Sequence, residues 1–221
     1  GQALRLYAER FVLPAHEKKK NAVNILGATP LDFSVNGQIQ SIARRLTEGG
    51  FSVQSVWAMG SETAAIDRTG EAEVNLVVSS VGLPVAKFLR ERFGTPYVVG
   101  VLFGDTVSAL LLGALQKSIH TGENEILPAG TPDAPDTVIL GESVTSRSLA
   151  AALLLDYGIC AEVICPVELP RELEGSFCRQ IEDEQDLQAA LSGARRVIAD
   201  PLFAPIVPQG AQFFPLPHEA Y

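Results

Sequence analysis

Hydrophobic positions along the chain follow two alternating patterns. Short apolar runs rich in β-branched residues are typical of buried strands, and longer stretches with apolar residues every three or four positions are typical of helices. The predicted strands cover 22–26, 51–56, 74–78, 97–101, 137–140, 161–165, 196–199 and 212–216. The predicted helices cover 3–13, 36–48, 62–68, 84–93, 107–119, 145–157 and 183–191. This order predicts an α/β fold with two Rossmann-like lobes built on parallel sheets.

One segment interrupts the alternation and divides the chain. Residues 123–136 carry three prolines, one glycine and four acids, which indicates a linker or a long surface loop. We therefore expect a first Rossmann-like domain at 21–122 and a second at 137–221. Residues 1–20 are expected to form an N-terminal helix and a linker that ends in the solvated basic run Lys18-Lys19-Lys20.

Composition narrows the class of protein. The chain has 221 residues, of which 47% are hydrophobic, and this apolar content excludes intrinsic disorder. A net charge of −9 argues against a nucleic-acid partner, because phosphate binding needs a basic face. No apolar stretch approaches the roughly 18–20 residues of a membrane span, and no signal-peptide pattern opens the chain, so we expect no membrane partner and a cytoplasmic location.

Metal-binding patterns are absent from the sequence. The three cysteines, Cys160, Cys165 and Cys178, have no CxxC spacing, and the three histidines form no zinc-type cluster. We expect the cysteines to be reduced structural thiols and expect no metal ligands in this chain. Because the chain begins at Gly1 and its single methionine is Met59, we also expect a piece cut from a longer protein.

Candidate ligand contacts lie in the turns that follow the predicted strands. Small residues there let a backbone approach a ligand closely, and helix starts favour anions. The candidates in the first domain are Gly27, Thr29, Gly60, Ser61, Ser79, Ser80 and Gly104. The competing interpretation is that Gly, Ser and Thr only turn corners and cap helices. No GxGxxG, P-loop or GxSxG motif occurs, so no catalytic residue can be assigned.

Several phrases together resemble a known family. They are Asn24-Ile25-Leu26-Gly27-Ala28-Thr29-Pro30-Leu31-Asp32-Phe33, Val56-Trp57-Ala58-Met59-Gly60-Ser61, Ala72-Glu73-Val74-Asn75-Leu76-Val77-Val78-Ser79, Glu91-Arg92-Phe93-Gly94-Thr95-Pro96-Tyr97, Gly141-Glu142-Ser143, Ala199-Asp200-Pro201-Leu202-Phe203 and Pro215-Leu216-Pro217-His218. Their order and spacing, from about residue 21 to 221, resemble the nitrogenase component 1 type oxidoreductases.

The resemblance implies a role within a larger enzyme. Subunits of this family have three Rossmann-like domains, and this chain resembles the second and third. The first domain, whose cysteines hold an inter-subunit cluster, is then missing, so an iron–sulfur cluster is expected in the full-length complex and none in this piece. The implied partners are a paralogous component 1 subunit and an ATP-dependent iron–sulfur reductase.

Two positions match cluster ligands of the nitrogenase α-type subunit. Ser79 stands where that subunit has a ligating cysteine, and His218-Glu219-Ala220-Tyr221 resembles its His-x-x-x-Tyr phrase. His218 therefore joins the candidate ligand contacts, although from its own surroundings it would be a surface or packed residue. A serine hydroxyl replaces thiolate poorly on iron, so the resemblance does not support nitrogen fixation.

Three functions remain open at this point. The first is a nitrogenase-like reductase subunit acting on an unknown small molecule bound between the lobes. The second is a non-catalytic scaffold of the same family that holds a cofactor precursor or an organic ligand. The third is a two-lobe binding protein of the periplasmic type, which the absent signal peptide disfavours.

Overall fold

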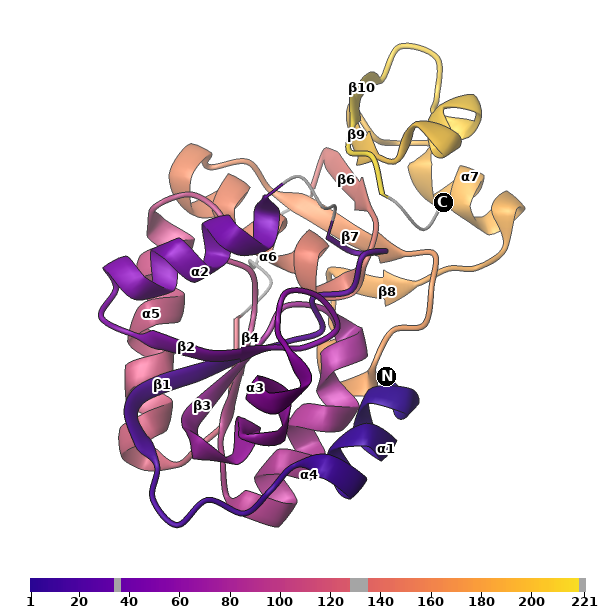
Figure 1. Ribbon diagram of the computed structural model, residues 1–221. Coiled ribbons are helices and arrows are strands. Elements are labelled where there is room, and N and C mark those ends of the chain that lie inside the picture. Colours follow the sequence, from indigo (N-terminus) through magenta and orange to yellow (C-terminus); the bar gives the residue numbers. More distant parts are fainter. Residues whose placement is uncertain (34–36, 128–134, 219–221) are drawn as a thin grey trace. The chain divides into compact units, whose positions relative to one another are not determined.

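The computed structural model describes residues 1–33, 37–127 and 135–218. The chain divides into two compact units, Gly1–Leu127 and Pro128–Tyr221. Each unit contains one five-stranded sheet whose strand pairs all run parallel (Figure 1). The predicted α/β fold class is thereby confirmed.

Unit 1 has the strand order β2-β1-β3-β4-β5. Its strands are β1 (Lys19–Leu26), β2 (Ser52–Val56), β3 (Ala72–Val77), β4 (Tyr97–Val99) and β5 (Glu125–Ile126). Its helices are α1 (Gln2–Phe11), α2 (Gln38–Glu48), α3 (Thr63–Asp67), α4 (Leu83–Phe93) and α5 (Thr106–Thr121), with 3-10 turns η1 (Thr69–Glu71) and η2 (Ser80–Gly82).

The central strands of unit 1 are buried on both faces. Residues 22–26 of β1 are all buried, because α2 and α5 lie on one side of the sheet and α1 and α4 on the other (Figure 1). This double cover explains why these strands read as apolar runs rather than as alternating patterns. Helix α2 faces the sheet with Ile39, Ile42 and Leu46, which recur at helical spacing.

A buried polar network crosses this apolar sheet. The Asn24 side-chain amide donates to Asn75 Oδ1 at 2.8 Å and to the Thr69 carbonyl at 3.1 Å. Asn24 Oδ1 accepts from Ser55 Oγ, and the Trp57 indole N–H donates to Thr69 Oγ1. All five residues are at most 1% exposed, so their hydrogen bonds hold β2, β1 and β3 in one register inside a dry core.

Unit 2 has the strand order β10-β9-β6-β7-β8. Its strands are β6 (Thr137–Leu140), β7 (Ala161–Cys165), β8 (Cys178–Gln180), β9 (Arg196–Ala199) and β10 (Gln212–Pro215). Its helices are α6 (Ser143–Tyr157) and α7 (Glu184–Leu191), with 3-10 turns η3 (Arg171–Leu173) and η4 (Pro201–Ile206). Leu187 and Leu191 of α7 pack in one core cluster with Val138, Leu140, Ile164, Val197 and Ala199.

The structure differs from the sequence-based expectation in three places. The predicted linker 123–136 contains β5, whose Glu125 and Ile126 pair with β4. The basic run is not a free linker, because Lys19 opens β1 and pairs with Glu71, and Lys18 Nζ donates to Thr95 Oγ1. Strand β8 was not predicted, because a three-residue edge strand is too short for a periodic signal.

Candidate functional site

The carboxyl edge of the unit 1 sheet has the topology of a ligand site. From β1 the chain first forms β2 on one side and then adds β3, β4 and β5 on the other. The order of strands therefore reverses between β1 and β3, and open α/β sheets bind ligands outside the strand ends at such a switch point. The loops that meet there are 27–33 after β1 and 78–82 after β3, which carry four of the predicted site residues.

Gly27 and Ser79 are in contact at the switch point, but both are buried away from solvent. Ser79 is fully buried, and its hydroxyl donates to the Gly27 carbonyl at 2.7 Å. Gly27 has φ +90°, and a Cβ there would lie 2.7 Å from Ser79 Oγ. A Cβ on Gly82 would lie 2.6 Å from the Leu26 carbonyl. The two loops therefore pack so closely that no side chain fits at Gly27 or Gly82. Gly27 and Ser79 lie buried beneath the surface of this edge and do not form an open contact surface.

The other predicted residues of unit 1 are less deeply buried. Thr29 is half-buried, and its hydroxyl donates to Asp32 Oδ2 at 2.7 Å, which fixes the loop after β1. The loop after β2 is joined to it by the bond from the Ala28 N–H to the Trp57 carbonyl. Half-buried Ser80 begins η2. Thr29 and Ser80 are therefore partly exposed at this edge, and their contact with a ligand stays a prediction.

Gly60 and Ser61 shape the loop after β2. Gly60 is exposed with φ +106°, and Ser61 Oγ accepts from the Val56 N–H at 2.7 Å. Ala58 in the same loop has φ +81°, which costs a non-glycine residue roughly 1–2 kcal/mol. This loop is therefore held in a strained conformation by the Ser61 hydroxyl and by the bond from the Ala28 N–H to the Trp57 carbonyl.

Gly104 belongs to a separate cluster that the sequence did not predict. Its carbonyl accepts from Ser108 Oγ and, at 3.3 Å, from Arg45 Nη1. Arg45 also lies 3.3 Å from Asp105 Oδ1, so a guanidinium stands over the start of α5. From the sequence, Arg45 is predicted only to belong to the polar face of α2. No local pattern indicates that its partner Asp105 lies 60 positions further along the chain.

Ser79 does not fit the ligation of a metal cluster. Its hydroxyl is committed to a carbonyl and is shielded from solvent. Within residues 1–33, 37–127 and 135–218, no three His, Cys, Asp or Glu side chains converge as a metal site. Ser79, the residue matched to the ligating cysteine, is therefore not placed to ligate a cluster.

Two acidic residues, Glu142 and Asp200, hold the turns at the carboxyl edge of the unit 2 sheet by hydrogen bonds. Glu142 caps α6, with Oε2 accepting from the Thr145 N–H and Oε1 from the Ser143 hydroxyl. Asp200 Oδ1 caps η4 through the Leu202 N–H, and its Oδ2 accepts from the His218 N–H at 2.7 Å. His218 is thus positioned through its backbone by Asp200, a residue the sequence did not single out. The remainder of the His218 phrase, residues 219–221, lies outside the described residues.

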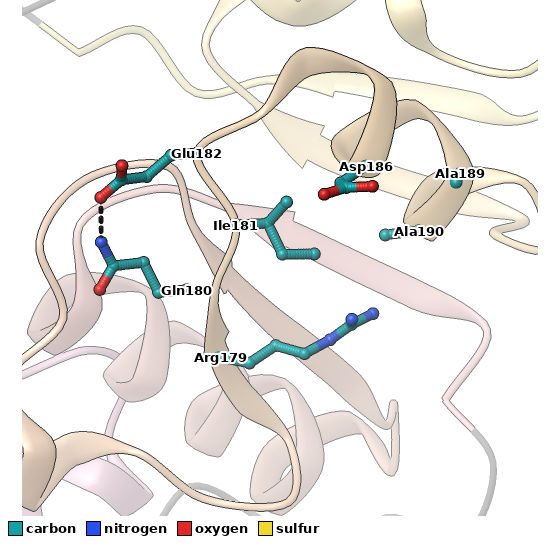
Figure 2. Close-up of a pocket in the computed structure, with 7 residues that line it drawn as sticks. All are labelled: Arg179, Gln180, Ile181, Glu182, Asp186, Ala189 and Ala190. Carbon is teal, nitrogen blue, oxygen red and sulfur yellow. Dashed lines mark hydrogen bonds between the residues drawn. The ribbon is translucent and has the colours of Figure 1, made fainter.

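Unit 2 also contains an open groove of about 600 Å³ beside its edge strand. Figure 2 shows it between helix α7 and the end of β8 with the segment that follows, lined by Arg179, Gln180, Ile181, Glu182, Asp186, Ala189 and Ala190. Gln180 Nε2 donates to Glu182 Oε1, and Arg179 Nε pairs with Glu162 at 2.6 Å. None of the predicted site residues lines it.

Comparison with known proteins identifies the class. Two doubly wound parallel sheets define a Rossmann-like α/β protein. The nitrogenase component 1 type oxidoreductase family matches residues 2–142, which is more than half of the chain. The chain belongs to this family, as its sequence phrases indicated.

The relatives agree with this assignment. A light-independent protochlorophyllide reductase polypeptide of Nostoc punctiforme is 30% identical over 108 residues, 48% of this chain and 21% of the relative. The corresponding protein of Synechococcus sp. (strain CC9311) is 26% identical over 204 residues, 86% of this chain and 37% of the relative. The matches thus span well under half of these relatives.

The fold itself matches a solved nitrogenase component. A structure described as "Nitrogenase Cp1 at pH 5" superimposes with a TM-score of 0.61 at 13% identity, over 98% of this chain and 55% of that one. A second, described as "Nitrogenase Cp1 at pH 6.5", gives a TM-score of 0.54 at 12% identity. At such identities the likeness concerns the fold alone. Among the described helices, none has both the length and the hydropathy that a membrane span requires.

Proposed function

We propose that this chain supplies two domains of a component 1 type subunit that reduces a small molecule. The observation that carries the proposal is the family match over residues 2–142. The electrons would come from an ATP-dependent iron–sulfur reductase, and a paralogous component 1 subunit would complete the complex. An iron–sulfur cluster would then be held by parts of that complex other than Ser79.

The substrate is proposed to be an organic molecule held by shape and hydrogen bonds. Two observations support this class. Relatives with 30% and 26% sequence identity are named light-independent protochlorophyllide reductase, so a tetrapyrrole is the first candidate for the substrate. In addition, Ser79 is tied to Gly27, so the unit 1 edge offers backbone and the hydroxyls of Thr29 and Ser80 rather than a ligand for iron.

The test uses the full-length subunit, purified anaerobically with its paralogous subunit and the reductase. We expect loss of protochlorophyllide absorbance that requires both ATP and dithionite. Thr29→Val and Ser80→Ala should raise KM severalfold, whereas Thr47→Val, at an exposed position late in α2, should leave KM unchanged. A complex that neither binds nor reduces a tetrapyrrole overturns the substrate proposal, and failure to engage an active reductase overturns the reductase role.

A non-catalytic scaffold is the alternative proposal. The observation in its favour is that the partly exposed side chains at Thr29, Ser61 and Ser80 carry hydroxyls, which neither lose nor gain a proton near neutral pH. A scaffold would bind the tetrapyrrole with the same dependence on Thr29 and Ser80. It would show no ATP-dependent turnover with a reductase that is active on another substrate.

A further inference from the structure

Two buried thiols of unit 2 lie on the same face of its sheet. The parallel register places Cys178 opposite Val163 and Cys165 opposite Gln180, so the cysteines are diagonal neighbours on β7 and β8. Cys165 is 0% and Cys178 is 1% exposed. Ile164 faces the core cluster that contains α7, so its neighbour Cys165 faces the opposite side, where α6 packs on β7.

The thiols interact with each other and with a cation. The Cys165 thiol donates to Cys178, which raises the pKa of Cys165 and lowers the pKa of Cys178. Burial opposes ionisation of both groups, and Arg147 favours it by a hydrogen bond to Cys178. The Arg147 guanidinium is fixed in place because its Nη1 also donates to the Leu173 carbonyl at 2.9 Å. The two thiols and the Arg147 guanidinium therefore form one contacting group in the interior of unit 2.

We propose that Cys165 and Cys178 form a two-coordinate site for a soft monovalent metal ion of the copper(I) class. Soft thiolates select such ions over harder divalent ones. On binding, the two thiols release two protons, and two thiolates around one monovalent ion carry a net charge of −1. Arg147 supplies the +1 that makes this buried group neutral, which removes most of the cost of burying it.

Glu142 is an acid that acts on both thiols, and its charge is compensated. Its carboxylate raises the pKa of both thiols and so opposes metal binding. Its two oxygens, however, accept from the Ser143 hydroxyl and the Thr145 N–H at the start of α6. The positive end of the helix therefore offsets much of its charge, and Arg147 remains the cation directly on the sulfur.

The geometry favours an ion over a disulfide. Diagonal neighbours on paired strands have Cα atoms roughly 7–8 Å apart, whereas cysteines more than about 7 Å apart cannot be bridged without backbone movement. A bridging ion needs the two sulfurs to move only slightly apart from hydrogen-bonding contact, whereas a disulfide needs them to close to about 2.05 Å. Two thiolates are too few for a tetrahedral zinc site or an iron–sulfur cluster, which take four ligands. The register therefore selects a two-coordinate ion.

The ion would reach the site by local opening of β8. This strand has three residues, lies at the sheet edge, and begins with Cys178. Short edge elements open at far lower free energy than the core of a unit. Entry thus requires no unfolding of β6, β7 or β9.

The experiment titrates the reduced, anaerobic full chain with copper(I) supplied as its bicinchoninate complex. We expect one ion per chain to be withdrawn from the dye. Cys165→Ser and Cys178→Ser should each weaken this by at least about 100-fold, and Cys160→Ser, the matched third thiol, should leave it unchanged. Arg147→Met should weaken binding about tenfold more than Arg147→Lys, which keeps the charge. Withdrawal that depends on Cys160, or none at all, overturns the proposal.

A second measurement needs no variants and so does not depend on their folding. The native wild-type chain is alkylated with and without copper(I), and mass spectrometry measures the modification rate of each cysteine. We expect copper(I) to protect Cys165 and Cys178 together while Cys160, which is half-buried, reacts at the same rate. Equal rates at all three positions with and without the ion overturn the site.

Discussion

Asn24 donates a hydrogen bond from its side-chain amide to Asn75 Oδ1, 2.8 Å away on the neighbouring strand. Both residues are fully buried, and the bond joins β1 to β3 at the level where the register pairs the two asparagines. A register slip of one strand by one residue would place the two amides on opposite faces of the sheet, where they could no longer bond each other. The pair therefore specifies the alignment of strands that end at the unit 1 edge.

Replacing Asn24 should destabilise unit 1 strongly. In Asn24→Ala, Asn75 Oδ1 and the Thr69 carbonyl lose the Asn24 amide in a dry core, and the Ser55 hydroxyl keeps only its contact with Thr69 Oγ1. We expect a loss of about 2–3 kcal/mol in the free energy of unfolding. Urea unfolding followed by Trp57 fluorescence measures it, because Trp57 is the only tryptophan and belongs to the same network. Gln40→Ala, at an exposed position of α2, is the control and should change the value by less than about 0.5 kcal/mol. Equal urea midpoints for Asn24→Ala and Gln40→Ala would contradict a stabilising role of the buried polar network.

The close contact at the switch point gives a second test. Gly27→Ala forces a Cβ to within 2.7 Å of Ser79 Oγ and 2.9 Å of the Gly82 nitrogen, at a φ of +90°. Strain and overpacking together should cost about 2–4 kcal/mol. Gly113→Ala in the exposed middle of α5, where nothing lies within 4 Å, should instead stabilise by about 0.5–1 kcal/mol.

The double variant separates the two causes. Gly27→Ala with Ser79→Ala removes the nearest atom but leaves the Gly82 nitrogen and the positive φ, so only part of the stability should return. The same urea titration measures both variants. Complete recovery would show that backbone strain at Gly27 is negligible, and no recovery would show that Ser79 Oγ yields without cost.

The sequence predicted the strands that carry periodic or continuous apolar runs. β1 and β3 were recognisable because burial on both faces demands uninterrupted apolar residues. The two-residue β5 and the three-residue β8 were missed, because so short a segment pairs only by virtue of its neighbour. The turns that form the candidate edge follow directly from the strand ends.

The state of each site residue could not be predicted from the sequence. Whether the Ser79 hydroxyl is available to a ligand depends on its hydrogen bond to the Gly27 carbonyl, which lies 52 positions away along the chain. Likewise, the Cys165 and Cys178 thiols meet only because β8 adds to the edge of β7 in one register. Composition and local pattern contain no signal for such long-range partners.

Unit 2 should lose stability in acid through Asp136. Arg196 Nη2 donates to both carboxylate oxygens, at 2.9 and 2.8 Å, and this bond lowers the pKa of Asp136. Because the folded pKa lies below the unfolded value of about 3.9, the stabilisation is present above that value and is lost as the pH falls through the folded pKa. The pair is about one-third exposed, so we expect only about 0.5–1 kcal/mol.

Asp136→Asn isolates this contribution. It should lower stability at pH 7 by that amount, and the difference should shrink as the pH falls below about 3.9, as measured by urea titrations followed by circular dichroism at pH 7 and at pH 3. Hydrogen exchange in β9 at pH 7 assigns the change to unit 2. A difference between wild type and variant that persists undiminished at pH 3 would show that packing, not charge, is responsible.

Asp200 should control the order of the segment that presents His218. Asp200 is 8% exposed, and its carboxylate accepts from the Leu202 N–H at 2.8 Å and the His218 N–H at 2.7 Å. Asp200→Ala therefore removes both the cap of η4 and the connection between the ends of β9 and β10. Loss of such a cap costs about 0.5–2 kcal/mol. Hydrogen exchange of residues 212–218 should accelerate about tenfold for a cost near 1.4 kcal/mol, while β6 and β7 keep their wild-type rates. Asp200→Asn retains one carbonyl acceptor, so its exchange rate at residues 212–218 should lie between those of the wild type and Asp200→Ala. Unchanged exchange at 212–218 in Asp200→Ala would mean that strand pairing of β10 with β9 alone positions His218.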